Sequence, residues 1–438
     1  MAALLVLSAC KRVDYSPTQT CLLENATLAS AGPGARFVPG EVLVTFKPAP
    51  QVLGVEAASV LRDFQLGSLA ADNGLAVATA MPGSLPSLLT TGGDPEGVAA
   101  ALRTDPRVEH AEPNWIYTTQ AEFDCVREQW NFSRFGVADA IRVGPGRHGA
   151  TVAVIDSGVD VDHPELTEAM LPGYNFVDNI PDPRPGSGGQ AAHGTHVAGI
   201  IASRGAAGPT GVAGFPGQVK VLPIRIFDDA GVVATFADLV TALTWAVGLE
   251  RIPGVPDNPY PADIVNLSLG GGVAQNAMLN DIVSRVTQAG VLVIAAAGND
   301  VPGILSPANG PDALAVGSVD SDFRLSDFSA WGGSGAIGIT APGGYGPSSC
   351  GTILSTLPNG LYGCSRGTSM AAPYVAGAAA LLLTHEPGLG PQELAARIAS
   401  AAYFDSGFMD GARYGAGILC ADRLLGARSS PSSQLCGY

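Results

Sequence analysis

The chain has 438 residues, of which 46% are hydrophobic, so it can bury a large core in more than one domain and is not disordered. Its formal charge of −16, from 39 acidic and 23 basic residues, argues against nucleic acid as a partner. The 57 glycines and 33 prolines predict many tight turns between short regular elements.

The first ten residues, MAALLVLSAC, are apolar and end in Leu-Ser-Ala-Cys. They resemble a bacterial lipoprotein signal, although they are short and lack a basic start. The resemblance implies that residues 1–10 are a signal segment, that Cys10 becomes the lipidated first mature residue, and that the protein is an extracytoplasmic bacterial protein, secreted or membrane-anchored. An ordinary export signal or a chance apolar end is the alternative. No later stretch has the uninterrupted apolar length of a membrane span.

Residues 11–35 have no hydrophobic period and are interpreted as a linker. A small α+β unit follows over residues 36–118. Its expected elements are a strand, a helix, a strand, a helix and a final strand, in the order FVPGEVLVTFKP, VLRDFQLGSLAADNG, LAVATAM, DPEGVAAALRTDP and VEHAEPNWIY. The composition changes again over residues 118–128.

From Gln129 onward, buried strands alternate with helices. Five runs are apolar on both faces and predict strands: TVAVID, VKVLPIRIF, ADIVNLSL, VLVIAAAG and ALAVGSV. Helices are expected at HGTHVAGIIASR, TFADLVTALTWAVGLER, NAMLNDIVSRVTQAG, SMAAPYVAGAAALLLTHEP and PQELAARIASAA. This alternation predicts an α/β fold with a parallel sheet covered by helices, whose ligands gather at the carboxyl ends of the strands.

Three chemical groups lie at such positions. Asp156 ends the first of these strands, His193 and His196 open a helix, and Ser369 stands before an apolar helix. Each group also has another explanation. Asp156 could be a turn residue, the two histidines could be zinc ligands or core residues, and Ser369 could be a helix cap. Zinc is disfavoured because no acid or thiolate accompanies the histidines. Together, a carboxylate, an imidazole and a hydroxyl are what an activated serine nucleophile requires.

The motifs VIDSGVD, HGTHVAG, AAAGN and GTSMAAP resemble the subtilisin-like serine protease family in this order, over roughly residues 129–425. The resemblance implies a three-layer, parallel-sheet peptidase domain acting on polypeptides. It also implies that Asp156 orients His193, that His193 is the general base, that Ser369 attacks, and that Asn299 stabilises the oxyanion.

The same resemblance implies a substrate-lining strand and no required cofactor. The expected substrate-binding residues are Ser268, Leu269, Gly270, Ala297 and Gly298. Many relatives carry an Asn-containing calcium loop at the position of SRGAAGPTGVAGFP, which has no Asn or Asp, so the usual calcium site is not supported; Glu165 stands where a ligand carboxylate would fall. Tyr374 replaces a histidine common in the family, outside the catalytic set.

Residues 36–118 resemble the family's inhibitory propeptide, which implies a ferredoxin-like fold and an intramolecular inhibitor of a zymogen. An unrelated small domain is the alternative. The enzyme's own serine is expected to cut between about residues 112 and 124. Residues 426–438 are a C-terminal tail, and a monomer is expected.

The seven cysteines become six when Cys10 is set aside, and an exported chain favours disulfides. Spacing suggests Cys350 with Cys364 and Cys420 with Cys436, which leaves Cys21 for Cys125; the sequence does not prove these pairs. Cleavage would then leave the enzyme tied to the segment that follows Cys10.

Two other functions are alternatives to a serine endopeptidase. A catalytically silent peptide-binding relative would use the same groove, but all four catalytic positions are intact. An esterase of the α/β-hydrolase type is disfavoured because no G-x-S-x-G motif surrounds Ser369 and the order of the triad differs.

Overall fold

The computed structural model describes residues 37–47, 55–81, 85–119, 122–124, 129–205, 212–215, 217–271, 276–345 and 351–427. The signal segment, the linker, most of the C-terminal tail and five of the seven cysteines lie outside these residues. Within them the chain builds three sheets, which are described in turn.

The amino-terminal unit is a ferredoxin-like βαββαβ fold, as expected. Its elements are β1 (Phe37–Phe46), α1 (Val55–Asp72), β2 (Ala76–Thr79), β3 (Ser87–Thr90), α2 (Pro95–Leu102) and β4 (Val108–Thr119). The strands pair antiparallel in the order β4-β1-β3-β2, over a small core that includes Val42, Val44, Leu69 and Leu89. The sequence did not predict β3, because its four residues are too few to show an alternating pattern.

The second sheet has nine strands in the order β17-β18-β14-β13-β12-β10-β6-β8-β7. All its pairs are parallel except that of β17 with β18. Five of the strands match the five apolar runs: β6 (Ala150–Asp156), β8 (Val219–Arg225), β10 (Ile264–Leu267), β12 (Leu292–Ala296) and β13 (Ala313–Val319). The four unpredicted members lie toward the edges: β7 (Tyr174–Asn175), β14 (Ile339–Pro342), β17 (Ala402–Tyr403) and β18 (Ile418–Leu419).

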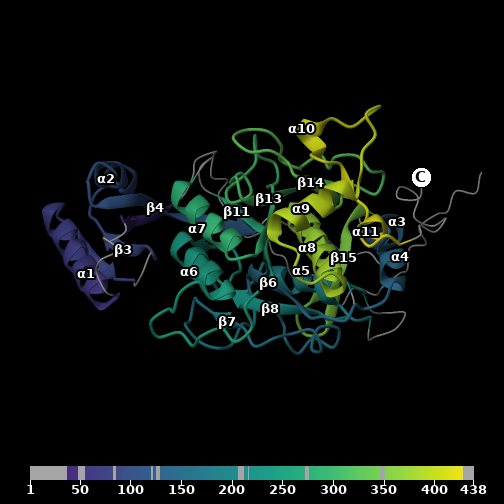
Figure 1. Ribbon diagram of the computed structural model, residues 1–438, viewed down its shortest axis with the longest axis horizontal. Coiled ribbons are helices and arrows are strands. Elements are labelled where there is room, and N and C mark those ends of the chain that lie inside the picture. The colour runs from purple at the N-terminus through teal and green to yellow at the C-terminus, as the bar shows by residue number, and fades with distance from the viewer. Residues whose placement is uncertain are drawn as a thin grey trace, which may run out of the picture. The chain divides into compact units, whose positions relative to one another are not determined.

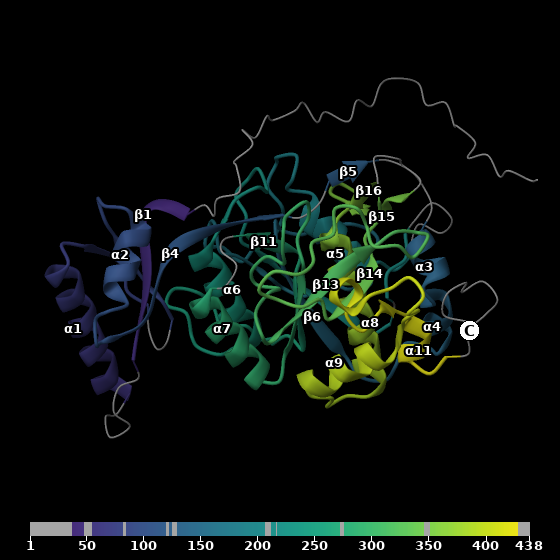
Figure 2. The same cartoon turned by 90° about the horizontal axis from the view of Figure 1, so that it is seen from above.

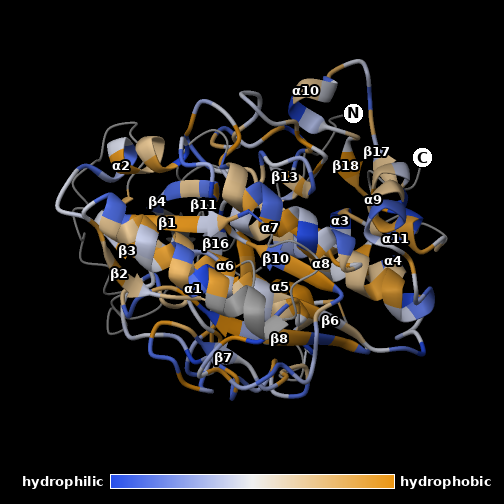
Figure 3. Cartoon of the chain, turned by 60° about the vertical axis from the view of Figure 1, so that its left-hand side comes forward, coloured by the Kyte–Doolittle hydropathy of each residue, from blue (hydrophilic) through white to orange (hydrophobic). Residues whose placement is uncertain are grey.

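Helices cover this sheet on both faces, which confirms the three-layer prediction (Figure 1). One apolar cluster contains α5 (His193–Ala202), α8 (Thr368–His385) and α9 (Pro391–Ser400), and the other contains α6 (Phe236–Val247) and α7 (Ala277–Gln288). Side chains of β6 alternate between the clusters, Val152 and Val154 to one and Ala153 and Ile155 to the other. Both faces are apolar, and Figure 3 shows β6 and β8 largely in hydrophobic colours.

The third sheet is formed by the hairpin β15 (Ile353–Leu357) and β16 (Leu361–Arg366), onto which β5 (Glu122–Asp124) pairs. Two short strands, β9 (Ala234–Thr235) and β11 (Leu269–Gly271), pair instead with β4 of the amino-terminal unit. Figure 2 shows β4 extending from its own sheet to β11, and β5 beside β16. Short helices α3 (Trp130–Arg134), α4 (Val137–Arg142), α10 (Gly411–Tyr414) and α11 (Ala421–Leu424) complete the chain.

Candidate active site

Asp156 and His193 form a buried hydrogen-bonded pair. Asp156 is the last residue of β6, and His193 is the first residue of α5. Nδ1 of His193 donates to Oδ1 of Asp156 over 2.7 Å, and both side chains are fully buried. The backbone N–H of Ser157 donates to the same carboxylate oxygen over 2.6 Å. A carboxylate so placed holds the imidazole with its proton on Nδ1 and leaves a lone pair on Nε2.

Backbone contacts hold the two elements together at this point. A Cβ on Gly194 would lie 2.3 Å from the carbonyl oxygen of Gly158 and 3.1 Å from Cβ of Asp156, so only glycine allows this approach. The hydroxyl of Ser157 donates to the carbonyl of Ala191 and accepts from the N–H of Gly194. The position of the imidazole therefore depends on the backbone around it. Within the described part of the chain, Nε2 of His193 has no hydrogen-bond partner.

His196 has a different environment, although it lies one turn further along α5. Its Nε2 lies 3.0 Å from the carbonyl of Ile353, and the side chain is fully buried. Burial, with a smaller effect of nearby His193, lowers the pKa of His196 to about 3. The ring is therefore neutral near pH 7 and packs as a core residue.

Ser369 is the second residue of α8, and Gly367 is the N-cap. Gly367 has φ 148° and ψ 163°, a backbone region that only glycine adopts without strain. The hydroxyl of Ser369 donates to the carbonyl of Ser268 over 2.9 Å, and the hydroxyl of Ser268 donates to the carbonyl of Ser369 over 2.9 Å. The serine is thus in the first turn but does not cap the helix, so the interpretation of Ser369 as a helix cap is wrong.

Pro373 explains one of these bonds. In a regular helix the N–H of residue 373 would donate to the carbonyl of Ser369, four residues earlier, but proline has no N–H. The carbonyl of Ser369 accepts from the Ser268 hydroxyl instead. Pro373 lies in the second turn of α8. The proline leaves the carbonyl of the key serine available for a contact with Ser268, beside β10 and β11.

Asn299 follows β12 and lies beside the start of α8. Its Oδ1 accepts from both the N–H and the hydroxyl of Thr368, each over 3.0 Å. These two donors fix which end of the amide is oxygen, so the Nδ2 donor group is directed away from Thr368. The N-terminus of α8 adds the positive end of a helix dipole. An amide donor and a helix terminus at one place suit the stabilisation of a developing negative charge.

The expected substrate-lining strand is occupied by the amino-terminal unit. In β11, Leu269 pairs with Thr119 and Gly270 pairs with Thr118, antiparallel. On the other side of β4, Ile116 pairs with Thr235 of β9. The enzyme strands therefore receive an extended segment by backbone hydrogen bonding, which is a common mode of peptide recognition.

The other predicted groove residues, Ala297 and Gly298, use their backbone groups inside the structure. The N–H of Ala297 donates to Val316, and its carbonyl accepts from Leu305. The N–H of Gly298 donates to the hydroxyl of Thr368, and its carbonyl accepts from Ala330. Their role in binding substrate remains a prediction.

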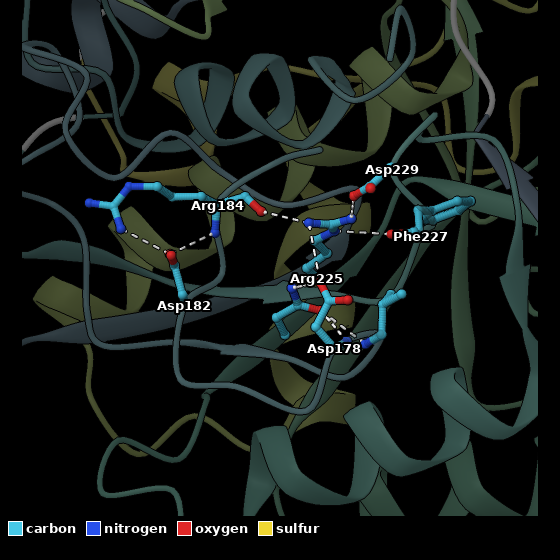
Figure 4. A network of polar contacts seen from close by, with 8 residues as sticks. Asp178, Asp182, Arg184, Arg225, Phe227 and Asp229 are labelled. Atoms are coloured by element: carbon cyan, nitrogen blue, oxygen red, sulfur yellow. Dashed lines mark hydrogen bonds and ion pairs between the residues drawn. The ribbon is translucent and has the colours of Figure 1, made fainter. Parts of the chain in front are cut away.

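Arg225 anchors the loop that leads to His193 (Figure 4). It is paired in register with Asp156 on the neighbouring strand and is 5% exposed. Its guanidinium donates to the carboxylate of Asp229 and to the carbonyls of Phe227 and Arg184. The buried guanidinium of Arg225 thus joins the segment at Arg184 to the segment that follows β8, at Phe227 and Asp229.

Several polar residues at the site were not predicted. Asn266 is fully buried in β10 and donates to the hydroxyl of Ser268 over 3.0 Å. Asn299 is held by Thr368, and the start of α5 is held by Ser157. The loop before His193 is held by Arg225. The available signal was a polar side chain inside an apolar strand, as in IVNLS, because such a residue needs a partner.

The remaining candidates are placed as follows. Glu165 is buried and accepts from the hydroxyl of Tyr362, whose pKa is raised to about 12 chiefly by burial. Tyr374 is buried among aromatic rings and donates to the carbonyl of Phe135, a packing role. Cys364 and Cys420 are buried; Cys10, Cys21, Cys125, Cys350 and Cys436 lie outside the described residues, so no pairing is tested.

Neither a metal-binding cluster nor a membrane-spanning helix is present among the described residues. Among them, no group of three or more His, Cys, Asp or Glu side chains is placed to hold a metal ion. None of the helices in the same part of the chain combines the length and apolarity needed to span a membrane.

The chain is similar to known proteins over both the amino-terminal unit and the enzyme. The profile of the subtilase family matches residues 147–417, and that of the fervidolysin N-terminal prodomain matches residues 24–114. A thermophilic serine proteinase of Bacillus sp. (strain AK1) is 34% identical over 350 residues, covering 79% of this chain and 78% of that protein. Subtilisin E of Bacillus subtilis (strain 168) is 31% identical over 331 residues, covering 74% and 77%.

An extracellular protease of Xanthomonas campestris pv. campestris is 31% identical over 371 residues, covering 76% of this chain and 61% of that protein. A solved structure of a protease from Pseudoalteromonas arctica PAMC 21717 superposes with a TM-score of 0.61 at 29% identity, over 68% of this chain and 96% of that one. Since the family profile covers more than half of the chain, and these relatives match it at up to 34% identity, the chain belongs to the subtilase family as a serine endopeptidase preceded by a prodomain.

Proposed function

We propose that the chain is an exported zymogen whose Ser369 cuts the segment joining the prodomain to the enzyme and then hydrolyses other polypeptides. The observation that carries this proposal is the pairing on both sides of that segment. Thr119, before it, pairs with Leu269, next to the serine's partner Ser268. Glu122, after it, pairs with Arg366, three residues before Ser369. Gln120 and Ala121 lie outside the described residues, and we place the cut between Thr119 and Glu122.

The proposed chemistry uses the four predicted side chains. Ser369 turns its hydroxyl from the Ser268 carbonyl to Nε2 of His193, which takes the proton as the oxygen attacks the peptide carbonyl. Asp156 stabilises the imidazolium through the 2.7 Å hydrogen bond. His193 then gives the proton to the leaving amine. Water hydrolyses the resulting ester with the same base, and Nδ2 of Asn299 stabilises the oxyanion in both steps.

Export and anchoring are the finer parts of this proposal. An extracellular relative and the lipoprotein-like start of the sequence support them. Lipid on Cys10 and a Cys21–Cys125 bridge would keep the processed enzyme on the membrane. Membrane fractions of processed protein, prepared with and without reductant, test this: release that requires reductant supports the bridge, and release without reductant refutes it.

The main experiment compares wild type with Ser369→Ala. We expect wild type to yield a fragment whose N-terminus is residue 120, 121 or 122 and which a fluorophosphonate probe labels. Ser369→Ala should remain full-length and unlabelled, while Ser400→Ala, on the exposed end of α9, should behave like wild type. Processing of purified Ser369→Ala would contradict cleavage by the chain's own serine. An unlabelled wild type would favour the alternative, a silent peptide-binding protein.

A further inference from the structure

Strand β16 is the part of the enzyme that meets the chain just after the proposed cut. It pairs antiparallel with β5, with Arg366 opposite Glu122, Ser365 opposite Phe123 and Cys364 opposite Asp124. In the backbone register, positions 122 and 124 therefore stand opposite alternate residues of β16, Arg366 and Cys364. Both positions are acidic in this sequence.

Arg366 is held in place beside this strand. Its guanidinium carbon lies 5.6 Å from the centroid of the Phe328 ring, and Phe328 is itself buried. A guanidinium over an aromatic face is stabilised by attraction to the ring, so the charge of Arg366 is held beside Phe328. The chain as a whole has 39 acidic against 23 basic residues, so a cation at this point reverses the sign of the average surface.

We propose that Arg366 determines specificity by favouring substrates with an acidic residue on the leaving-amine side of the cut, at the position that Glu122 holds in the chain's own junction. This rests on the proposed function, because it takes the junction as the enzyme's first substrate. Residues directly opposite in an antiparallel pair have Cβ atoms about 4.5 to 5.5 Å apart, within reach of a guanidinium. A lysine there would meet a like charge.

The effect is modest, because Arg366 is partly exposed to water. Opposite charges across strands favour a substrate by about 2- to 5-fold over a neutral residue, and like charges disfavour it by a similar factor. The preference falls with added salt, since exposed charges are screened.

The test uses three internally quenched peptides with the junction sequence IYTTQAEFD, residues 116–124, carrying Glu, Gln or Lys at position 122. For processed wild-type enzyme we expect kcat/KM to fall in the order Glu, Gln, Lys. Arg366→Glu should reverse the order, and Arg366→Gln should cut the three peptides at equal rates. The matched control is Arg397→Glu on α9, which makes the same change of net charge at an ion pair with Glu386 and should keep the wild-type order.

Equal rates for the Glu and Lys peptides with wild type, or an unchanged order in Arg366→Glu and Arg366→Gln, would overturn the role of Arg366 while leaving the protease intact. A processed enzyme that cuts none of the peptides would refute the proposed function, and this inference with it. Fluorophosphonate labelling shows that each variant is folded at the active site. If Arg366→Glu is not labelled, the order of rates in Arg366→Gln decides.

Discussion

The nine-stranded sheet and the sheet that contains β4 hold their functional parts in different ways. The first is almost entirely parallel, with helices and apolar clusters on both faces, and it carries Asp156 at a strand end. The second is antiparallel, and the enzyme contributes only the short strands β9 and β11 to it. The groups of the reactive centre are therefore fixed by a permanent core. The prodomain is held by backbone pairing at a strand edge that extended peptides can use, and by packing of Leu43, Leu85 and Trp115 into the apolar cluster of α6 and α7.

A substitution at Asp156, which the nine-stranded sheet holds in place, should have the greatest effect on activity. Asp156→Asn replaces an acceptor by a group that can donate to Nδ1 of His193, which favours the wrong tautomer. We expect the rate of junction cleavage to fall by about 10⁴-fold while thermal unfolding of the full-length chain changes little. The measurement is the time course of processing by gel and mass. Asp162→Asn, a change at an exposed acid, is the control; a loss below tenfold for Asp156→Asn would contradict the assigned role.

Asn299 separates anchoring from donation. Asn299→Asp keeps an oxygen for the N–H and hydroxyl of Thr368 but removes the Nδ2 donor, whereas Asn299→Ala removes both. We expect both variants to lose about 10²- to 10³-fold in kcat, with smaller changes in KM. Steady-state kinetics on a junction peptide provide the measurement. Retained turnover in Asn299→Asp would show that only the anchor matters.

Asn114 of β4 is a side-chain contact between the prodomain and the enzyme. Its Oδ1 accepts from the N–H of Ala237 in the first turn of α6, and its Nδ2 donates to Glu41. Losing such a helix cap costs about 0.5 to 2 kcal/mol, so in Asn114→Ala the cut prodomain should leave about 2 to 30 times faster. The readout is the delay between processing and full peptide hydrolysis. Asn73→Ala, in the loop after α1, is the matched control and should leave the delay unchanged.

The smallest expected effect is on pH dependence. Asp238 lies in the first turn of α6, and burial, with help from the prodomain's Glu41, raises its pKa from 3.8 to about 6. An acid whose pKa is raised in the docked state binds its proton more tightly there than after release. Docking therefore weakens as the pH rises toward about 6, the pKa of Asp238 in the docked state, and is constant well above that value.

Asp238→Asn should remove this slope. The measurement is the fraction of processed enzyme that still carries the prodomain after incubation at each pH, separated by size-exclusion chromatography. A slope that remains in the Asn variant would assign the pH dependence to other groups.

The sequence predicted the parts of the molecule whose signal is local. The apolar runs located the five central strands, and the motifs around Asp156, His193 and Ser369 located the reactive groups. Short strands such as β3 and β14 were missed, because strands of four residues supported by distant neighbours leave no period.

Long-range contacts set what else was missed. The cap of α8 is Gly367 rather than Ser369, since the backbone arriving from β16 decides where the helix begins. The bonds of Arg225 join segments brought together only by the sheet. Neither could be derived from neighbouring residues in the chain.

The central position of β4 has a consequence for timing. It pairs with β1 over residues 108–115 and with the enzyme strands β11 and β9, one on each side, over residues 116–119, so cutting the chain after Thr119 removes none of its backbone pairing. If the chain is cut there, as proposed, the prodomain would stay bound until it unfolds or is digested. Its own core is small, so we expect it to be marginally stable without the enzyme. After cleavage, the folding stability of the prodomain would therefore set the delay before the active site is free to bind other substrates.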